Sequence, residues 1–544
     1  MRSHWLPPIP VLVLALLVPM AGMIPTWQGF LFEELPNRIF MGFRYMPLDH
    51  YQYAAFIRQA QDGGGLLMRN PFASEPQLGV FVLPLFWAVG ALARLTGGSI
   101  LVCWELFRLV GGALYILAFW GLSGVYFRTR GHRTLATALF SLGGGLDWIF
   151  LALDAAGVPG VDRLLYPSRF HWNWSTFGSM QMPNWIWPAM VLTVAVKAAC
   201  GSGRQRDLAL LGLMPLLWFM HPYSAMVGYL SFALLPLAPL VVAAGGLVPM
   251  PWSIFRARLR VAFPALLSFV LVVPYLVWAR SDLVFRLSSE RGTLWTETFS
   301  PWWYIQAYGL ILPLAWFGLR ALIKESSLHT DLLFSWLAAA IILSINPLYA
   351  GVKFQYLVFP PLALLATRGL LELYAGLPLA RQLAGSRAAM MGLAGALCLN
   401  SLVIPIKDFS STPLDSKIFM TSEELTTMKW LDRQPDGVVL SSKRAGNRIP
   451  WLASKVVFVG HWFLTPDHDA KLSKARMFFS HQVPLPTRAA ILQESRARYV
   501  YVSPDEAPEG FDSTGLPLTR IYQAGQHAIY RVDTPDSANN QPAR

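Results

Sequence analysis

The stretch Arg44-Tyr45-Met46-Pro47-Leu48-Asp49-His50-Tyr51-Gln52-Tyr53 is the first polar segment after an apolar run, and the rest of the chain is organised around it. It opens a short helix whose apolar residues follow the spacing i, i+3, i+4 and i+7, namely Tyr53, Phe56, Ile57 and Ala60. The pattern ends at Gly63-Gly64-Gly65. We expect this helix to lie flat on a bilayer surface, with Asp49 where water meets lipid.

The composition is that of a polytopic membrane protein. Hydrophobic residues make up 54% of the 544 residues and charged residues only 14%. The net charge of +13 is spread over loops, where Lys and Arg face anionic membrane lipids. No basic stripe with interleaved aromatic residues occurs, so we predict no nucleic-acid partner.

Apolar runs of about 20 residues, long enough to cross roughly 30 Å of hydrocarbon, follow one another along the first 406 residues. They predict an all-α membrane part with 11 to 13 transmembrane helices. Basic clusters recur after alternate runs, and the positive-inside rule places them in the cytoplasm. The run at 79–97 breaks this alternation, so it is either re-entrant or lies on the surface, unless one basic cluster breaks the rule.

The domain organisation follows from a change in composition near residue 406. Residues 1–406 form the membrane part, which includes an outer-face loop at 28–77. Residues 407–535 combine strand-like runs with helical patterns and predict a small α/β domain, and 536–544 a disordered tail. If the last membrane run exits outward, this domain is periplasmic or lumenal. We expect a bacterial inner membrane, with the C-terminal domain in the periplasm.

Local patterns refine the α/β part. Strands are predicted at 438–440, 456–458, 499–502 and 528–532, with helices at 421–433 and 487–496. Thr421 is the expected N-cap of the first of these helices, and Glu424 completes a capping box.

Several well-known motifs are missing from the sequence. There is no P-loop, no zinc-ligand spacing, no Gly-x-Ser-x-Gly and no dinucleotide-binding fingerprint. The triplet Gly143-Gly144-Gly145 lies inside an apolar run and indicates a close contact between helices.

Ionisable residues gather instead on one predicted face of the membrane. These are Asp49, Asp147, Asp154, His171, His221, Arg280, Arg286, Glu290, Arg291, Lys353 and His461. An unpaired charge near a membrane is costly, so such a gathering favours a functional site. Arg and Lys together suit a phosphate, the first by bidentate contacts and the second as a point charge.

The chain begins with a membrane helix, followed by a long outer loop in which an acidic residue opens an amphipathic helix. Many membrane spans and a C-terminal α/β domain come next. This order of features resembles the GT-C class of polyprenyl-phosphate-sugar-dependent glycosyltransferases. Relatives that transfer mannose or aminoarabinose carry Asp-Glu-x-x-Tyr in the first outer loop. The matching stretch here is Asp49-His50-Tyr51-Gln52-Tyr53, so Asp49 and Tyr53 match, and His50 stands where Glu is expected. This departure puts a metal role of the second acid in doubt, and whether a divalent metal takes part is left open.

Two further stretches are similar to features of the same class. Residues 353–365, which begin Lys353-Phe354-Gln355-Tyr356, resemble a late basic–aromatic–proline–aliphatic helix. Gly460-His461-Trp462-Phe463-Leu464-Thr465 resembles a loop of the tail domain in bacterial members. The oligosaccharyltransferase signature Trp-Trp-Asp-Tyr-Gly is absent, so that activity is not carried over.

The resemblance implies a mechanism. A sugar linked to an isoprenoid phosphate is transferred to the hydroxyl of a glycan, lipid or protein acceptor at the outer face, with Asp49 as general base. Lys353 with one or more of Arg280, Arg286 and Arg291 would hold the leaving phosphate. Further substrate-binding candidates are Tyr53, His221, Tyr356 and His461.

Each candidate also has a structural interpretation. Asp49 is a good N-cap for a helix beginning at His50. His221 precedes Pro222 and can end a helix, and Asp147 can bond to a neighbouring helix. The three outer arginines can be a solvated loop face, Lys353 can extend to lipid head groups, and His461 can be structural within the tail. Glu105 and Arg108, three residues apart, are expected to pair.

Two other functions stay open at this point. A lipid or glycan flippase, or a transporter, would use the same interfacial charges, although no internal repeat is seen. A non-catalytic scaffold with a GT-C-like frame is the other alternative, because the motif is incomplete.

Overall fold

The computed structural model describes residues 6–31, 37–44, 46–161, 174–240, 252–293, 301–323, 325, 327–346, 351–376, 392–401, 403, 417–508 and 510–533. The predicted disordered tail at 536–544 and the candidate His171 lie outside these residues. The chain divides into two compact units. Unit 1 comprises 1–24, 104–276 and 293–412, and unit 2 comprises 25–103, 277–292 and 413–544. Unlike the predicted division, this one groups residues 28–77 with the C-terminal part of the chain.

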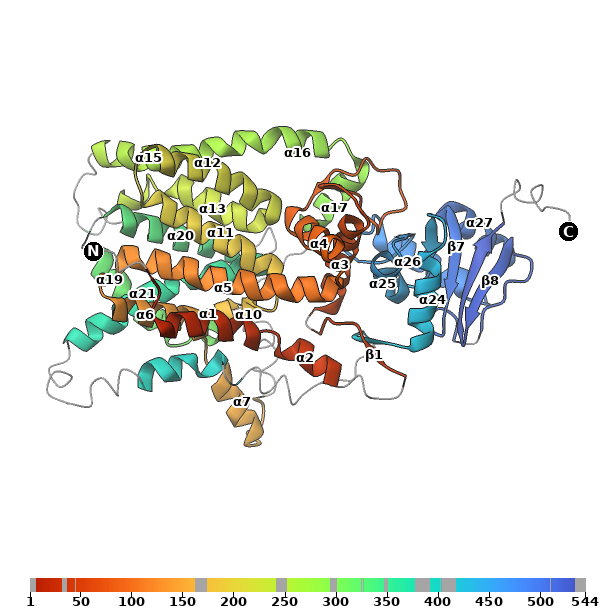
Figure 1. Ribbon diagram of the computed structural model, residues 1–544, viewed down its shortest axis with the longest axis horizontal. Helices are drawn as coiled ribbons and strands as arrows, with labels where there is room; N and C mark the ends of the chain where they lie inside the picture. The colour runs from red at the N-terminus through yellow and green to blue at the C-terminus, as the bar shows by residue number, and fades with distance from the viewer. Residues whose placement is uncertain are drawn as a thin grey trace. The chain divides into compact units, whose positions relative to one another are not determined.

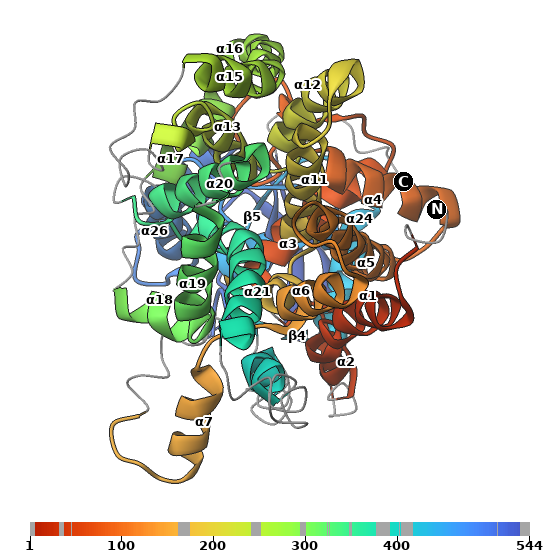
Figure 2. The same ribbon diagram turned by 90° about the vertical axis from the view of Figure 1, so that its left-hand side faces the viewer.

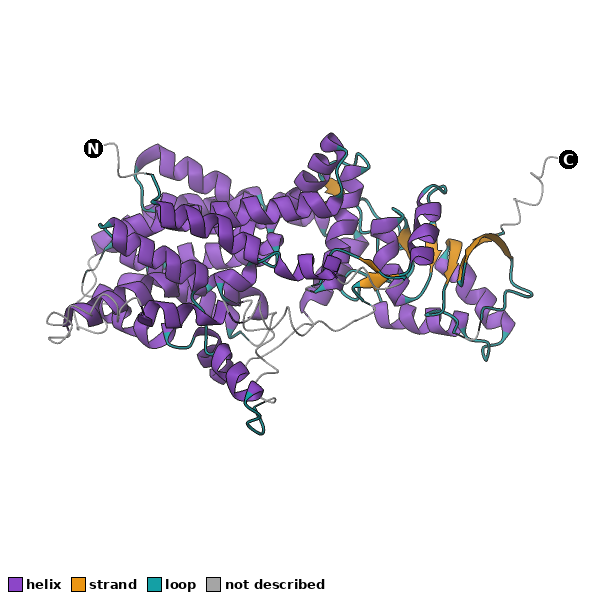
Figure 3. Ribbon diagram, turned by 60° about the horizontal axis from the view of Figure 1, so that its bottom comes forward, coloured by secondary structure: helices purple, strands orange, loops and turns teal. Residues whose placement is uncertain are grey.

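Unit 1 is helical, and all the described strands belong to unit 2 (Figure 3). The helices of unit 1 are α1 (Ile9–Ala21), α5 (Ile100–Tyr126, from Trp104 onward), α6 (Arg130–Leu142), α7 (Asp147–Ala155), α10 (Thr176–Ser179), α11 (Pro183–Ala199), α12 (Gly203–Met220), α13 (Pro222–Leu234), α15 (Trp252–Leu267), α18 (Pro301–Tyr308), α19 (Ile311–Ile323), α20 (Leu328–Ser344), α21 (Phe359–Gly376) and a helix at 392–401. Two 3₁₀ segments, η3 (Ser268–Leu271) and η4 (Gly351–Leu357), complete it. Helices α2 (Ile24–Leu31) and α16 (Val273–Ala279) each contribute residues to both units.

Several helices are candidate membrane spans. By length and composition, α5 and the continuous helix Trp252–Ala279 can each cross a bilayer. Three bent helix pairs raise the number to five if each pair is one span, with bends of 40° between α1 and α2, 50° between α6 and α7, and 85° between α18 and α19. The polytopic membrane class is therefore confirmed, and the total of 11 to 13 stays a prediction.

The apolar run at 79–97 does not cross a bilayer by itself. It forms α4 (Pro84–Thr96), which has 13 residues. At about 1.5 Å per residue this is roughly 20 Å, shorter than the hydrocarbon core. Because α4 is too short to span the hydrocarbon core, it does not reverse the side of the membrane on which the next basic cluster lies. This explains the break in the alternation.

Glycines bring helices of unit 1 into backbone contact. A Cβ atom on Gly318 of α19 or on Gly369 of α21 would lie 1.9 Å from a backbone oxygen of the other helix, and the two helices run side by side in Figure 2. A Cβ atom on Gly145 would lie 1.8 Å from the backbone oxygen of Gln306. The predicted close contact of the triplet Gly143–Gly145 is confirmed for Gly145 against α18, although the triplet lies in the break between α6 and α7 and not within a helix.

Unit 2 combines short helices with strands (Figure 1). Its helices are α3 (Pro47–Gln61), α4, α17 (Leu283–Thr293, to Gly292), α24 (Ser422–Asp432), α25 (Lys443–Leu452), α26 (His468–Phe479) and α27 (Leu485–Ser495). Its strands are β1 (Ile39–Phe40), β2 (Leu67–Met68), β3 (Phe81–Val82), β4 (Phe419–Met420), β5 (Val438–Leu440), β6 (Val456–Val457), β7 (Ala497–Val502), β8 (Leu518–Ala524) and β9 (His527–Val532).

A mixed five-stranded sheet forms the centre of the C-terminal part, in the order β6-β5-β7-β9-β8. Strand β5 pairs in parallel with β6 and β7, whereas β9 pairs antiparallel with β7 and β8. Along β7, Val500 and Val502 enter the core beneath α26 and α27, and Tyr499 and Tyr501 point to the opposite face. From Tyr499 to Val502 the strand is buried on both faces, as expected for a continuous run of aromatic and β-branched residues.

The predicted α/β part is confirmed in most of its elements. All four predicted strands and both predicted helices are present. Helices α25 and α26 and strand β8 were not predicted, and in β8 the order Leu-Thr-Arg-Ile-Tyr-Gln-Ala lacks the regular alternation by which a half-buried strand is predicted. Thr421 caps α24 as predicted, with its hydroxyl accepting from the Glu424 N–H at 3.1 Å. The Glu424 carboxylate bonds elsewhere, as described below.

Candidate functional site

Helix α3 presents Asp49 in its first turn. The helix begins at Pro47, a residue suited to the first helical position, after Met46 in the left-handed conformation (φ 42°). The Asp49 side chain is 23% exposed, and a carboxylate in the first turn is favoured by the helix dipole. The alternative that Asp49 is the N-cap of a helix beginning at His50 is wrong, because Pro47 starts the helix two residues before Asp49.

The predicted apolar stripe of α3 is confirmed as a buried face, but protein covers it. Tyr53 stacks on Phe86 of α4 with ring centroids 5.0 Å apart. A Cβ atom on Gly90 of α4 would lie 2.3 Å from the backbone oxygen of Ile57. The expectation that this face rests on a bilayer is wrong, because α4 already occupies it. The role of Tyr53 in substrate binding stays a prediction.

His461 lies against Asp49. The His461 Nε2 atom is 3.3 Å from Asp49 Oδ1, and the His461 side chain is 2% exposed. His461 belongs to the segment Gly460–Thr465, which we call the 460–465 loop. Within it, the backbone N–H groups of Leu464 and Thr465 donate to the His461 carbonyl at 3.1 and 2.9 Å. The loop thereby folds tightly around the residue that contacts Asp49.

Asn70 fixes the 460–465 loop from the N-terminal half of the chain. Its side chain is completely buried and donates to the Leu464 carbonyl at 2.7 Å. Its Oδ1 accepts from the Phe72 N–H at 2.9 Å, which is the hydrogen bond of an Asx turn. The Phe72 ring lies 6.0 Å from the His461 ring. Asn70 is not among the predicted site residues, although an Asn before Pro71 signals such a turn.

The three candidate arginines of unit 2 differ in their surroundings. Arg291 is half-buried, donates to the Thr465 carbonyl at 2.9 Å and lies 3.5 Å from the Asp469 carboxylate. Arg291 therefore holds the C-terminal end of the 460–465 loop through a hydrogen bond. Arg280 and Arg286 are exposed, which agrees with the solvated-loop interpretation and leaves their guanidinium groups accessible to an anion.

His50 packs among aromatic side chains. It is 2% exposed and stacks on Phe43 at 4.9 Å between ring centroids. Among the described residues, no group of three or more His, Cys, Asp or Glu side chains is placed to hold a metal ion. Asp49 and His461 alone supply two donors, fewer than the three protein ligands of a typical catalytic zinc site. These residues do not by themselves fit a metal, and no step is assigned to one.

The candidates in unit 1 form a separate cluster. The Tyr356 hydroxyl lies 2.5 Å from the Ser224 hydroxyl and 3.3 Å from His221 Nδ1, and its ring stacks on Trp185 at 5.3 Å. His221 ends α12 and caps α13, accepting from the Ser224 N–H at 3.3 Å, so the predicted turn role is confirmed. Lys353 is half-buried in η4, the 3₁₀ segment that also carries Tyr356.

Two structural predictions in unit 1 are confirmed. Asp147 is buried at the start of α7, and its Oδ2 accepts from Asn400 Nδ2 at 3.4 Å, so it bonds to a neighbouring helix. Arg108 pairs with Glu105 at 3.1 Å. Arg108 also donates to the Gly22 carbonyl at 3.0 Å, at the end of α1.

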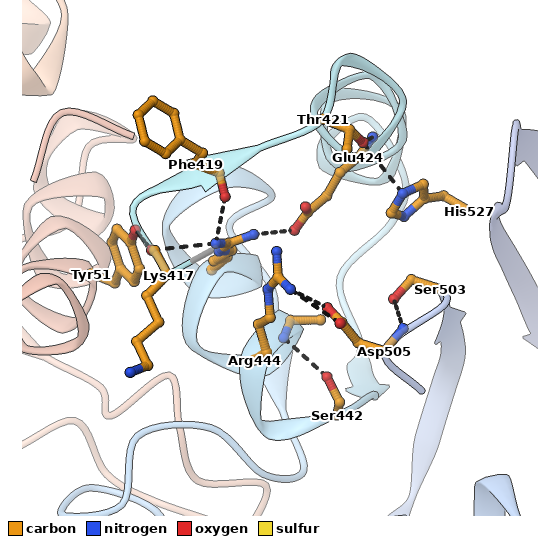
Figure 4. Close-up of polar contacts among 12 residues, drawn as sticks. Tyr51, Lys417, Phe419, Thr421, Glu424, Ser442, Arg444, Ser503, Asp505 and His527 are labelled. Carbon is orange, nitrogen blue, oxygen red and sulfur yellow. Dashed lines mark hydrogen bonds and ion pairs between the residues drawn. The ribbon is translucent and has the colours of Figure 1, made fainter. Parts of the chain in front are cut away.

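A buried polar network ties α3 to the C-terminal part of unit 2 (Figure 4). Arg448 is 1% exposed, pairs with Glu424 at 2.7 Å and donates to the Phe419 carbonyl at 2.9 Å. The Tyr51 hydroxyl donates to the Lys417 carbonyl. Burial raises the pKa of Tyr51, so its hydroxyl stays a donor. The sequence did not indicate this network, because its members come from three separate segments, at Tyr51, at 417–424 and at Arg448.

No protein-family model matches this sequence, and no curated protein matches it. Solved structures resemble it in three dimensions. The Archaeoglobus fulgidus oligosaccharyltransferase in its apo form has a TM-score of 0.57 at 13% identity, with 91% of this chain and 69% of that chain covered. ArnT from Cupriavidus metallidurans bound to undecaprenyl phosphate has a TM-score of 0.56 at 12% identity, with 96% and 98% covered. The arabinofuranosyltransferase AftD from Mycobacteria has a TM-score of 0.53 at 17% identity, with 96% and 40% covered.

Proposed function

We propose that this chain, which has the fold of the GT-C glycosyltransferases, transfers a sugar from an isoprenoid-phosphate-linked donor to an acceptor hydroxyl. The observation that carries the proposal is the position of Asp49, in the first turn of α3, partly exposed and hydrogen-bonded to His461. The donor class is supported by two of the similar structures, ArnT bound to undecaprenyl phosphate and AglB in complex with a dolichol-phosphate.

Asp49 acts as the general base in this proposal. Its carboxylate accepts the proton of the acceptor hydroxyl, whose oxygen then forms a bond to the anomeric carbon of the sugar. The bond from that carbon to the phosphate oxygen breaks, and the isoprenoid phosphate leaves with the electron pair. A positioned general base typically contributes about 10²–10⁴-fold to the rate.

The leaving phosphate needs cations to stabilise its charge. Arg280 and Arg286 belong to the same unit as Asp49, are exposed and can form bidentate contacts to a phosphate. Cations placed where negative charge develops are usually among the largest contributions to catalysis. The phosphate role of Lys353 and the substrate roles of His221 and Tyr356, all in unit 1, stay predictions.

The proposal includes a cellular setting. Candidate membrane spans support an integral membrane protein. We propose that the reaction occurs at the outer face of a bacterial inner membrane, with the C-terminal part of unit 2 in the periplasm. The acceptor would then be a component of the cell envelope.

The test uses the full chain reconstituted in proteoliposomes. A panel of undecaprenyl-phosphate-linked glucose, mannose, galactose and arabinose is supplied with envelope extract of the host as the acceptor source, and released undecaprenyl phosphate is measured. We expect Asp49→Asn to lower the release rate by about 10²–10⁴-fold without unfolding the protein. The control is Asp436→Asn, whose side chain is 99% exposed.

Each alternative gives a distinct outcome. A flippase would move the labelled lipid between leaflets and release no undecaprenyl phosphate. A scaffold would show no release in the wild type, and equal rates for wild type and Asp49→Asn would falsify the base role of Asp49.

A further inference from the structure

We infer that His461 is a positioning residue for Asp49, and that the 460–465 loop thereby makes the C-terminal part of unit 2 a component of the catalytic apparatus. The inference rests on the proposed function. It assigns His461 a role through the carboxylate, whereas the sequence analysis proposed that His461 contacts the substrate.

The contact with Asp49 determines which nitrogen of His461 carries the proton. An ionised carboxylate only accepts hydrogen bonds, so the Nε2 atom, 3.3 Å from Oδ1, must be the donor. This hydrogen bond restrains rotation of the carboxylate about its Cβ–Cγ bond. Proton transfer from a hydroxyl is faster when the base is already held at hydrogen-bond distance, so such restraint raises the rate.

The restraint is effective only because the 460–465 loop is itself held. Asn70 holds the Leu464 carbonyl, and Arg291 holds the Thr465 carbonyl. The Thr465 hydroxyl accepts from the Gly460 N–H at 3.1 Å and closes the loop. These partners come from two other segments of unit 2 and from the loop itself, so His461 is held in place by contacts other than its own contact with Asp49.

Backbone contacts at Gly446 and Gly460 restrict movement at the base of the 460–465 loop. A Cβ atom on Gly446 of α25 would lie 1.9 Å from the Val459 carbonyl oxygen, and one on Gly460 would lie 2.6 Å from the Gly446 oxygen. The strand end before the loop and the helix α25 therefore touch through their backbones. A shift of the loop would require α25 to move as well.

The other nitrogen of His461 argues against a packing role alone. His461 Nδ1 is buried and has no hydrogen-bond partner among the described residues. Leaving a buried polar atom unsatisfied typically costs about 1–3 kcal/mol. An apolar side chain would fill the same space without this cost, so the imidazole is explained by the contact of its Nε2 with Asp49.

The experiment is a double-mutant cycle between the two side chains in the proteoliposome assay. His461→Leu removes the donor, and we expect it to lower kcat by about 10²-fold, as a misplaced catalytic group does. Because the substrate is not contacted, KM for the donor lipid should stay within about threefold of the wild-type value. His461→Gln keeps an N–H donor and should recover kcat to within about tenfold of the wild type.

The decisive comparison is made in the Asp49→Asn background. If His461 acts through Asp49, adding His461→Leu to Asp49→Asn lowers the residual rate no further. Equal losses in both backgrounds would overturn the inference, because they indicate a general structural role. His527→Leu is the matched control, because His527 is a second buried histidine of the same unit that contacts Tyr501 and Thr421, and it should leave kcat unchanged.

The two proposals can fail separately. A wild-type rate in Asp49→Asn refutes the base role of Asp49 and with it this inference. An inactive Asp49→Asn together with an unaffected His461→Leu leaves the proposed function intact and refutes only the positioning role. If His461→Leu lowers the unfolding temperature, the kcat of His461→Gln decides the matter.

Discussion

Arg448 shows how one residue can hold a structure together at several points. Its guanidinium pairs with Glu424 and donates to the Phe419 carbonyl. Burial opposes its charge, but Glu424, Tyr51 and Tyr501 together outweigh this effect and raise the pKa of Arg448. The arrangement follows the rule that a buried ion must be paired and hydrogen-bonded.

We predict that Arg448→Met destabilises unit 2 by about 3–5 kcal/mol, because it leaves the Glu424 carboxylate buried without its cation. The measurement is the denaturation midpoint in detergent. Arg444→Met is the matched control, since its pair with Asp505 is largely exposed, with side-chain exposures of 33% and 44%. Exposed pairs typically contribute about 0–1 kcal/mol. Similar losses in the two variants would contradict the prediction.

At the scale of single residues, the sequence indicated which side chains suit a functional site, but not which of them contact one another. Asp49 could be predicted as a site residue because it lies near the start of a helix that follows a membrane run. His461 could be predicted because its loop resembles a loop of the GT-C class. Their contact could not be predicted, because 412 positions separate them. The starting residue of α3 was also missed, because Pro47 as first helical residue competes with Asp49 as a cap.

At the scale of elements, the pairing of α3 with α4 sets the position of Asp49. The apolar stripe of α3 packs on α4, and Gly90 allows the helices to touch. Periodicity predicted this stripe correctly. It could not distinguish lipid from protein as the covering material, because both are apolar.

We predict that Gly90→Ala destabilises the protein by about 1–3 kcal/mol, as overpacking does. The added Cβ would lie 2.3 Å from the Ile57 oxygen and 2.5 Å from the Ala60 Cβ. In a helix without such contacts, the same change would stabilise by roughly 1 kcal/mol. Gly65→Ala, where nothing lies within 4 Å, is the control for the same substitution in the same unit. A higher unfolding temperature for Gly90→Ala would contradict the prediction.

At the scale of the whole molecule, unit 2 joins segments from the beginning, middle and end of the chain. His527 of β9 contributes to this joining. The Thr421 hydroxyl lies 3.4 Å from its Nε2 (Figure 4). The Tyr501 hydroxyl lies 2.7 Å from its Nδ1. The sequence predicted an α/β fold for the C-terminal part. It did not indicate that residues from before 103 belong to the same unit, because composition records no long-range contact.

We predict that the protein loses stability as the pH falls from 7.5 to 5. Burial lowers the pKa of His527, although Glu424 and Glu423 act in the opposite direction, and burial likewise lowers the pKa of His468. Below an unfolded-state pKa of about 6.5 the unfolded chain takes up protons that the folded chain excludes, so unfolding is favoured. At higher pH both states are neutral and the effect disappears.

The measurement is the unfolding temperature as a function of pH. In His527→Gln the amide oxygen can still accept from Tyr501 and does not titrate, so the decline below pH 6.5 should be shallower. An identical pH dependence in the wild type and in His527→Gln would show that His527 is not responsible.

The hydrogen bond from Tyr51 to the Lys417 carbonyl joins residues 366 positions apart. At about 5–20 residues per second, a ribosome needs on the order of 20–70 s to make the intervening chain. For that time α3 has been synthesised but lacks the partners that bury Tyr51. Biosynthesis of this protein therefore includes an interval in which α3 can already pack on α4, while Tyr51 still lacks its hydrogen-bond partner from the C-terminal part.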